Sequence, residues 1–232
     1  MIDVRPFTQL GRFQNDWLNA RYHFSFSGYH DPARMSWGPL RVWNNDRIKA
    51  GTGFAPHPHR DMEIITYVMK GAISHEDHLG NKGRTGAGQI QIMSAGRGIV
   101  HAEFNKEAEE TELFQIWIEP SSKGVPPRWE TLDFPTDERA GKLVTLASGK
   151  EADQAPLKIY QDAALLCGTL RAGESVDYPL GADRRAYMVA AKGTVTVNGT
   201  KLGPRDGAAI AKEAKLTIAA SEDAEVVLVD VP

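Results

Sequence analysis

The chain consists largely of short β-favouring segments separated by turn residues. Residues 62–69 (MEIITYVM) are rich in Ile, Thr, Tyr and Val, and residues 89–93 (QIQIM) alternate polar and apolar side chains. The segments expected to contain strands are 38–49, 62–69, 89–93, 112–119, 164–170, 185–191, 194–198, 215–219 and 225–231. Gly, Pro, Asn and Asp stand between them, as in the hairpin signal Asn198-Gly199. Many short strands joined by such turns are typical of a sandwich or barrel, so we expect an all-β fold.

Two segments carry finer local predictions. Within 38–49 (GPLRVWNNDRIK), the run Asn44-Asn45-Asp46 predicts a turn after a short strand, because Asn and Asp favour turns. Helical periodicity is weak, and a short helical turn is expected only at 15–21.

The two halves of the chain share a faint repeat. YVMKGAIS (67–74) precedes GAGQIQIMSAG (86–96), and YMVAAKGTVTV (187–197) precedes GPRDGAAIAKEA (203–214). Both stretches follow the order strand, Lys-Gly turn, strand, glycine-rich turn, strand, and their Lys-Gly pairs lie 122 residues apart. Residues 119–141 hold four prolines and predict a linker or strap. We therefore expect two β domains in tandem, 1–135 and 136–232.

The composition narrows the class of protein. Hydrophobic residues make up 41% and charged residues 25% of 232 residues, which suits a folded chain. No run approaches the roughly 20 apolar residues of a membrane helix, and MIDVRPFTQL lacks the apolar stretch of a signal peptide. We therefore expect a cytoplasmic protein without a membrane partner. Cys167 is the only cysteine, which excludes a disulfide framework and a thiolate zinc site. The net charge of −3 argues against direct nucleic-acid binding.

Histidine is confined to the first half of the chain. All seven histidines lie in the first 101 residues, and the last 131 residues have none. They are His23, His30, His57, His59, His75, His78 and His101. Any imidazole chemistry therefore belongs to the first predicted domain, and the second is expected to be structural or to bind by other means.

Two short pairs carry the chemistry. His57-Pro58-His59 and His101-Ala102-Glu103 each place two metal-binding side chains at i and i+2. On a strand such side chains share a face, with Cβ atoms roughly 6.5–7 Å apart. If the two strands face each other, three imidazoles and one carboxylate converge. This donor set suits Fe(II), Mn, Co, Ni, Cu or Zn, and a six-coordinate ion keeps two positions for substrate, oxygen or water.

The spacing of these pairs resembles the two motifs of the cupin superfamily. The positions that match the first motif are Gly51, His57, His59 and Glu63. The positions that match the second motif are Gly98, His101 and Asn105. Two departures occur, because Gly71 closes the first motif one residue late and Gly96 replaces the usual proline of the second.

More narrowly, the chain resembles bacterial members of the pirin family. The stretches that carry the resemblance are FSFSGYHDP (24–32), HPHRDMEIITYVMKG (57–71), HEDHLGN (75–81), QIMSAGRGIVHAE (91–103) and LFQIWIEP (113–120). The second half matches mainly in its strand pattern and in GTVTVNG (193–199). The resemblance implies a bicupin, two jelly-roll β-barrel domains in tandem. It also implies one divalent metal per chain, usually iron as Fe(II), in the N-terminal domain.

The identity of the fourth ligand depends on which pattern holds. In pirins it is the carboxylate two residues after the third histidine, which is Glu103 here, whereas in most other cupins it is the glutamate of the first motif, Glu63. Strand parity leaves both open, since Glu63 shares a face with His57 and His59 if the strand stays regular. Following the pirin pattern, we expect His57, His59, His101 and Glu103 as ligands, with Glu63 orienting one of them.

The other histidines are expected to be structural. His75 and His78 flank the turn in SHEDHLGN and are expected to be solvated, the alternative being that His75 or Asp77 lines the mouth of a pocket. His23 and His30 are expected to make structural hydrogen bonds.

The pirin resemblance implies quercetin 2,3-dioxygenase activity, in which O2 opens a flavonol ring and CO is released. Glu103 would be the catalytic base for the flavonol 3-hydroxyl, and the partners would be a small planar aromatic substrate and O2. Two alternatives stay open. One is a redox-sensing metalloprotein that regulates by binding a protein partner, and the other is a cupin enzyme with a different substrate, because one fold hosts many chemistries.

Overall fold

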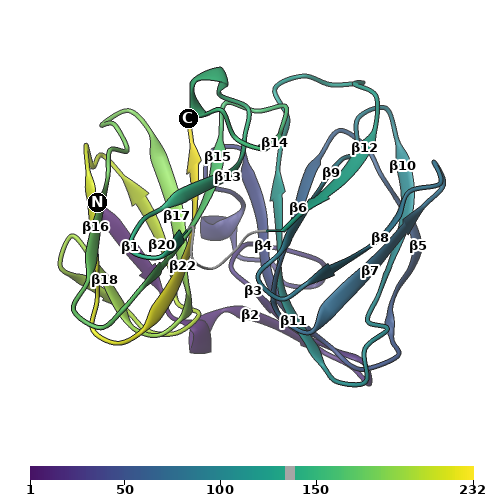
Figure 1. Ribbon diagram of the computed structural model, residues 1–232, viewed down its shortest axis with the longest axis horizontal. Coiled ribbons are helices and arrows are strands. Elements are labelled where there is room, and N and C mark those ends of the chain that lie inside the picture. The colour runs from purple at the N-terminus through teal and green to yellow at the C-terminus, as the bar shows by residue number, and fades with distance from the viewer. Residues whose placement is uncertain (134–138) are drawn as a thin grey trace. The chain divides into compact units, whose positions relative to one another are not determined.

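The computed structural model describes residues 1–133 and 139–232, which form β-strands joined by turns and loops (Figure 1). Three short 3-10 helices lie wholly within these ranges, η1 (Phe7–Gln9), η2 (Pro32–Arg34) and η4 (Glu151–Asp153). In the same ranges no helix has the length and apolar character needed to span a membrane. The predicted all-β fold is confirmed.

The chain divides into two compact units. The N-terminal unit comprises Gly11–Phe134 with Ile159–Gln161, and the C-terminal unit comprises Met1–Leu10, Pro135–Lys158 and Asp162–Pro232. The first ten residues belong to the C-terminal unit because β1 (Ile2–Arg5) pairs antiparallel with β20 (Gly207–Ala211). The predicted boundary at residue 135 places these ten residues in the first domain. Strand pairing between segments distant in the sequence leaves no local sequence pattern that would predict it.

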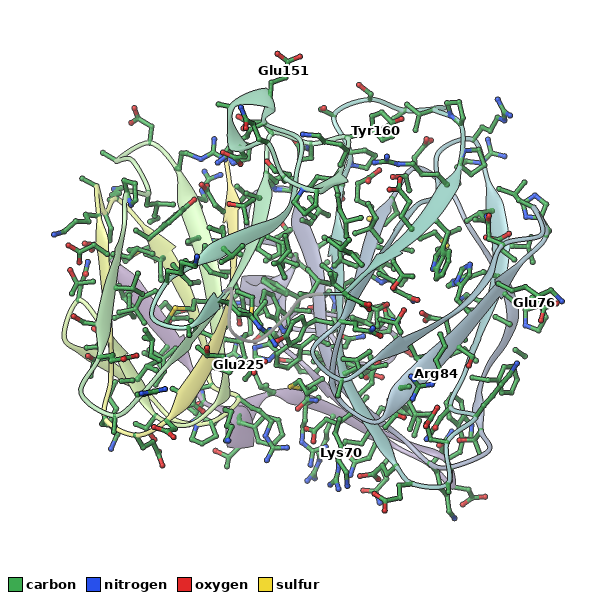
Figure 2. The ribbon with its side chains drawn as sticks, viewed as in Figure 1. Lys70, Glu76, Arg84, Glu151, Tyr160 and Glu225 are labelled. Atoms are coloured by element: carbon green, nitrogen blue, oxygen red, sulfur yellow. The ribbon has the colours of Figure 1, made fainter. Side chains whose placement is uncertain are left out.

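Two sheets build the N-terminal unit, with strand orders β12-β9-β6-β11-β4-β3-β2 and β5-β10-β7-β8. The seven strands of the larger sheet are β2 (Gly11–Gln14), β3 (Leu18–Tyr22), β4 (Leu40–Ile48), β6 (Glu63–Lys70), β9 (Ile90–Ser94), β11 (Thr111–Ile118) and β12 (Arg128–Leu132). The four strands of the smaller sheet are β5 (Gly53–His59), β7 (Ala72–Asp77), β8 (Lys82–Gly86) and β10 (Ile99–Phe104). On the smaller sheet, the exposed Glu76 pairs with Lys82 at 2.7 Å (Figure 2).

The C-terminal unit has the same organisation of seven plus four strands, in the orders β1-β20-β17-β22-β15-β13-β14 and β16-β21-β18-β19. Its remaining strands are β13 (Val144–Ser148), β14 (Leu157–Lys158), β15 (Ala164–Leu170), β16 (Ser175–Tyr178), β17 (Arg185–Lys192), β18 (Val195–Val197), β19 (Thr200–Leu202), β21 (Leu216–Ala220) and β22 (Ala224–Val231). Gly71 and Gly193, the glycines of the two Lys-Gly turns, adopt φ values of +73° and +72°. Positive φ at both supports the repeat, because glycine takes this conformation without strain.

The interiors of the two units differ in chemistry. The C-terminal unit is filled by aliphatic side chains, among them Met188, Ile210 and Leu228. Among the residues described in the N-terminal unit, apolar clusters form around Leu113 and Met93, and polar side chains such as Gln91, Glu103 and Gln115 are buried as well. The interior of the N-terminal unit is therefore able to support polar chemistry, and the aliphatic core of the other unit serves stability.

Two local predictions are wrong. Asn44-Asn45-Asp46 forms no turn and lies inside β4, which pairs with β3 on one side and β11 on the other. Residues 18–21 belong to strand β3, and none of residues 15–21 is helical. In both cases pairing within the sheet outweighs the local preference of the residues. Part of the predicted linker 119–141 is strand β12, and residues 134–138 of it lie outside the described residues.

Candidate metal centre

Antiparallel pairing of β5 with β10 brings the two histidine-containing pairs together. His101 lies opposite His57 in the register, and Ile99 lies opposite His59. The imidazole centroids are 4.5 Å apart for His57 and His101, 4.8 Å for His57 and His59, and 5.1 Å for His59 and His101. One nitrogen from each ring lies within 4.8 Å of the other two. We call His57, His59 and His101 the histidine triad.

Hydrogen bonds leave the Nε2 atoms of two triad members available. Nδ1 of His57 lies 2.8 Å from the carbonyl oxygen of Ala55, which accepts only, so Nδ1 carries the proton. Nε2 of His101 is buried and has no hydrogen-bond partner within the described part of the chain. Burial, together with the neighbouring imidazoles, lowers the pKa of His59 to about 4 and that of His101 to about 3. The lowered pKa values favour neutral rings at His59 and His101, and a free Nε2, as in His57 and His101, fits a divalent transition metal.

A second buried histidine supports the triad. Nδ1 of His75 lies 3.4 Å from Nδ1 of His101, and Nε2 of His75 lies 3.0 Å from a carboxylate oxygen of Asp77. If His101 binds a metal through Nε2, its Nδ1–H donates to His75, and His75 in turn donates to Asp77. Such chains orient metal-binding imidazoles. The expectation that His75 is solvated is wrong, because β7 continues to Asp77 and turns His75 inward, where it is 2% exposed and stacks on Trp129.

Glu103 lies beside the triad with both carboxylate oxygens hydrogen-bonded. Nε2 of Gln115 donates to Oε2 at 2.6 Å, while Nε2 of Gln91 at 2.6 Å and the Thr66 hydroxyl at 3.4 Å donate to Oε1. One carboxylate oxygen lies within 4.8 Å of ring nitrogens of His75 and His101. Burial raises the pKa of Glu103 to about 7, although the three hydrogen bonds favour the charged form. The carboxyl group is thus able to bind and release a proton near neutral pH.

A row of buried polar side chains crosses the larger sheet of the N-terminal unit. Its members, each opposite the next in the strand register, are Tyr22, Asn44, Gln115, Thr66 and Gln91. The last three hold Glu103. Sequence reasoning missed the row, although the polar residues alternating with aliphatic ones in QIQIM and ELFQIWIE were its signal. Such alternation ordinarily indicates a solvated face, whereas here successive residues of β6 and β9 are buried whichever face they lie on.

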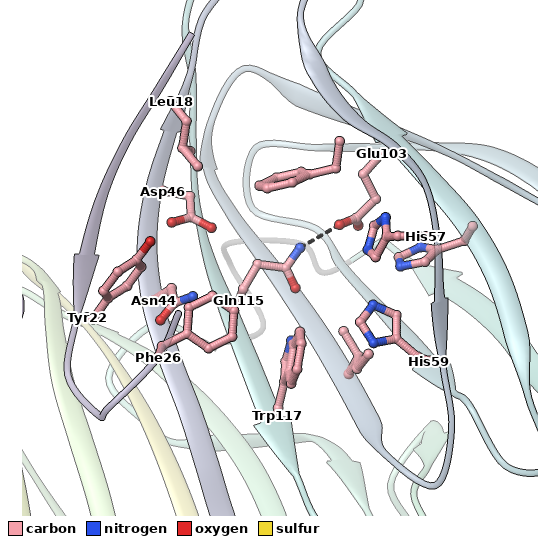
Figure 3. Close-up of a pocket in the computed structure, with 13 residues that line it drawn as sticks. Leu18, Tyr22, Phe26, Asn44, Asp46, His57, His59, Glu103, Gln115 and Trp117 are labelled. Atoms are coloured by element: carbon pink, nitrogen blue, oxygen red, sulfur yellow. Dashed lines mark hydrogen bonds between the residues drawn. The ribbon is translucent and has the colours of Figure 1, made fainter. Parts of the chain in front are cut away.

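A pocket of about 190 Å³ lies in front of the triad (Figure 3). Besides the triad and Glu103, its lining residues are Leu18, Tyr22, Phe26, Asn44, Asp46, Phe54, Ile64, Gln115 and Trp117. Trp117 meets the ring of His59 edge-on at 5.0 Å and that of Phe26 at 5.4 Å. Aromatic walls with a few convergent polar groups are typical of a small-molecule site.

Asp46 and Tyr22 add a titratable pair to this pocket that the sequence did not reveal. Burial and, secondarily, the charge of Glu103 raise the pKa of Asp46 to about 8. Burial and the charge of Asp46 raise the pKa of Tyr22 to about 12. Both groups are therefore mainly protonated at neutral pH.

Glu63, the alternative carboxylate, contacts other residues. The strand β5 ends at His59 and β6 begins at Glu63, with Asp61 at a φ of +46° between them. Strand parity therefore does not extend from His59 to Glu63. The Ser94 hydroxyl donates to Oε2 of Glu63 at 2.7 Å, and the glutamate is absent from the residues that line the pocket.

The two units have the organisation of a bicupin. Adjacent strands of the N-terminal unit carry the histidine triad, which is a candidate metal site. Residues 3–118 match the sequence profile described as Pirin, and residues 145–231 match the profile described as Quercetinase C-terminal cupin domain. The chain belongs to the pirin family.

Relatives of known name or structure agree with this assignment. The chain is 59% identical over 230 residues to a pirin-like protein of Caulobacter vibrioides, covering 99% of each chain. It is 42% identical over 233 residues to the quercetin 2,3-dioxygenase of Escherichia coli K12, covering 100% of this chain and 99% of the relative. The crystal structure of the bacterial pirin YhhW from Escherichia coli, in complex with nickel(II), superposes with a TM-score of 0.94 at 41% identity, covering 100% of this chain and 99% of that one.

Proposed function

We propose that this protein is a metal-dependent dioxygenase that opens flavonols such as quercetin with O2 and releases CO. The observation that carries the proposal is the convergence of the histidine triad and Glu103 on an aromatic-lined pocket. The printed name of the Escherichia coli relative, quercetin 2,3-dioxygenase, supports the choice of substrate.

In this proposal His57, His59, His101 and Glu103 hold the metal. Three imidazoles and a carboxylate suit Fe(II), which we propose as the resident ion, and they also suit Mn, Co, Ni, Cu and Zn. When bound, such a metal supplies Lewis acidity that lowers the pKa of a substrate hydroxyl group.

The chain's own residues supply the remaining chemistry. Glu103 takes the proton of the flavonol 3-hydroxyl at Oε2. Within the described residues, this oxygen accepts one hydrogen bond, from Gln115, whereas Oε1 accepts two. The aromatic side chains of Phe26, Phe54 and Trp117 flank a planar ring system and exclude water from it.

Quercetin-dependent oxygen uptake tests the proposal. The protein is stripped of metal, reloaded without oxygen with Fe(II), Mn, Co, Ni or Cu, mixed with quercetin and exposed to air, while O2 and CO are measured. His59→Ala and Glu103→Gln should abolish turnover. His78→Ala, which changes an exposed histidine outside the triad, should leave turnover unchanged. Absence of turnover with every metal would overturn the dioxygenase proposal, and capture of a protein partner would then be the next experiment.

A further inference from the structure

The pocket has a polar wall that the proposed mechanism does not use. Tyr22 on β3 and Asn44 and Asp46 on β4 line the same pocket as the histidine triad. Figure 3 shows these three side chains on the side away from His57 and His59, with Gln115 between the two groups. We call Tyr22, Asn44 and Asp46 the polar wall.

The polar wall contains acceptors that no described residue satisfies. Oδ1 of Asn44, Oδ1 of Asp46 and Oε1 of the adjacent Gln115 are buried and receive no hydrogen bond within the described part of the chain. Asn44 and Asp46 are only 4% and 3% exposed. Buried polar groups nearly always have a partner, so a cluster of three around one pocket indicates a ligand that supplies hydrogen-bond donors.

The orientation of Gln115 follows from its neighbour. Its Nε2 donates to Oε2 of Glu103 at 2.6 Å, and a carboxylate oxygen only accepts from an amide. Oε1 of Gln115 must therefore point away from Glu103. Glu103 differs from Asp46 in this respect. Three side chains donate to the Glu103 carboxylate, whereas no described residue donates to Oδ1 of Asp46.

We propose that Tyr22, Asn44 and Asp46 form a second subsite, which hydrogen-bonds phenolic hydroxyl groups on the part of the substrate remote from the histidine triad. The inference rests on the proposed function and narrows its substrate class to planar aromatic molecules with hydroxyl groups at both ends. A phenolic hydroxyl both donates and accepts. A buried, protonated Asp46 offers the matching acceptor and donor on its two oxygens.

Binding measured without oxygen tests the subsite. Two probes are used, quercetin and 3-hydroxyflavone, which keeps the 3-hydroxyl and its neighbouring carbonyl but lacks the other hydroxyl groups. Each is titrated into nickel(II)-loaded protein, with tryptophan fluorescence as the readout because Trp117 lines the pocket. The wild type should bind quercetin at least about tenfold more tightly than 3-hydroxyflavone, because 3-hydroxyflavone leaves the buried acceptors of the polar wall unpaired.

Substitutions test whether the polar wall causes the preference for quercetin over 3-hydroxyflavone. Asp46→Leu and Asn44→Leu should each lose most of the preference, and either one carries the test if the other fails to fold. Asp46→Asn should keep it, because an amide also donates and accepts. Asn45→Leu is the matched control, since Asn45 lies between them on β4 but does not line the pocket. Calorimetric nickel(II) affinity should be the same in all four variants.

The outcomes separate this inference from the proposed function. Equal affinities of the wild type for the two probes, or an unchanged preference in both leucine variants, would overturn the subsite even if both flavonols consume oxygen. A preference that both leucine variants lose would support the subsite even if neither flavonol consumes oxygen, a result that would overturn the dioxygenase proposal alone.

Discussion

The contribution of Glu103 to the stability of the metal-free protein should fall as pH rises, because its carboxyl group is buried. Its pKa is raised from 4.5 to about 7 in the folded state. Between these values the folded chain binds the proton more tightly than the unfolded chain. The stabilisation is therefore fully present below pH 4.5 and is lost as pH rises through 7. The two pKa values correspond to about 3 kcal/mol in total, of which about 2–3 kcal/mol is lost between pH 5 and pH 8.

Urea unfolding of the metal-free wild type and Glu103→Gln at pH 5 and pH 8 measures this loss. The glutamine is neutral at both pH values, so the wild type should lose about 2–3 kcal/mol more of its free energy of unfolding than the variant. Contributions from the triad occur in both proteins and largely cancel in the comparison. Removal of the Glu103 charge also lowers the pKa of Asp46. The variant then loses less stability through Asp46, which enlarges the difference between the two proteins.

Equal pH dependence in the two proteins would refute the argument that burial dominates the pKa of Glu103. Metal provides a further check, since a carboxylate that holds a divalent ion stays ionised. The wild type loaded with nickel(II) should therefore lose less stability between pH 5 and pH 8 than the metal-free protein.

Three further substitutions test the geometry of the site. Asp77→Asn removes the charge at the end of the imidazole chain to His101 and should weaken metal binding about 10- to 100-fold in calorimetric titrations; unchanged affinity would contradict the orienting role of the chain. Glu63→Gln should leave metal affinity unchanged, and a loss comparable to that of Glu103→Gln would reinstate this residue as a ligand. Gly53→Ala should lower both the melting temperature and metal affinity, because its Cβ would overlap the Glu103 carbonyl oxygen and separate β5 from β10. A melting temperature equal to that of the wild type would show that the two strands tolerate the added atom.

Part of the metal centre is predictable from local periodicity. On a strand, side chains two residues apart share a face, so the two pairs predicted two short ligand-bearing surfaces before any tertiary contact was known. The register of β5 against β10 then places His57 directly opposite His101. The same rule does not place Glu63 on the face of His57 and His59, because Asp61 interrupts the strand with a positive φ. The identity of Asp61 alone does not predict this conformation.

The polar interior of the N-terminal unit was not predictable from residue preferences. Asn44 and Asp46 favour turns in general, yet β4 keeps them extended because strands pair with it on both edges. His75 was expected in solvent because it stands near a turn, yet β7 carries it inward. A polar side chain can be buried where it finds a hydrogen-bond partner. Such partners lie far away in the sequence, so the preferences of single residues do not predict these positions.

By itself, the sequence determined the all-β class, the repeat marked by two Lys-Gly turns and the restriction of imidazole chemistry to one half. These properties depend on local preferences and on counts, which need no knowledge of long-range contacts. The tertiary structure alone decided which buried polar groups surround Glu103, which carboxylate lies beside the triad and which acceptors face the pocket without a partner. Those features arise where strands from different parts of the chain pair and bury their side chains together, so no single segment encodes them.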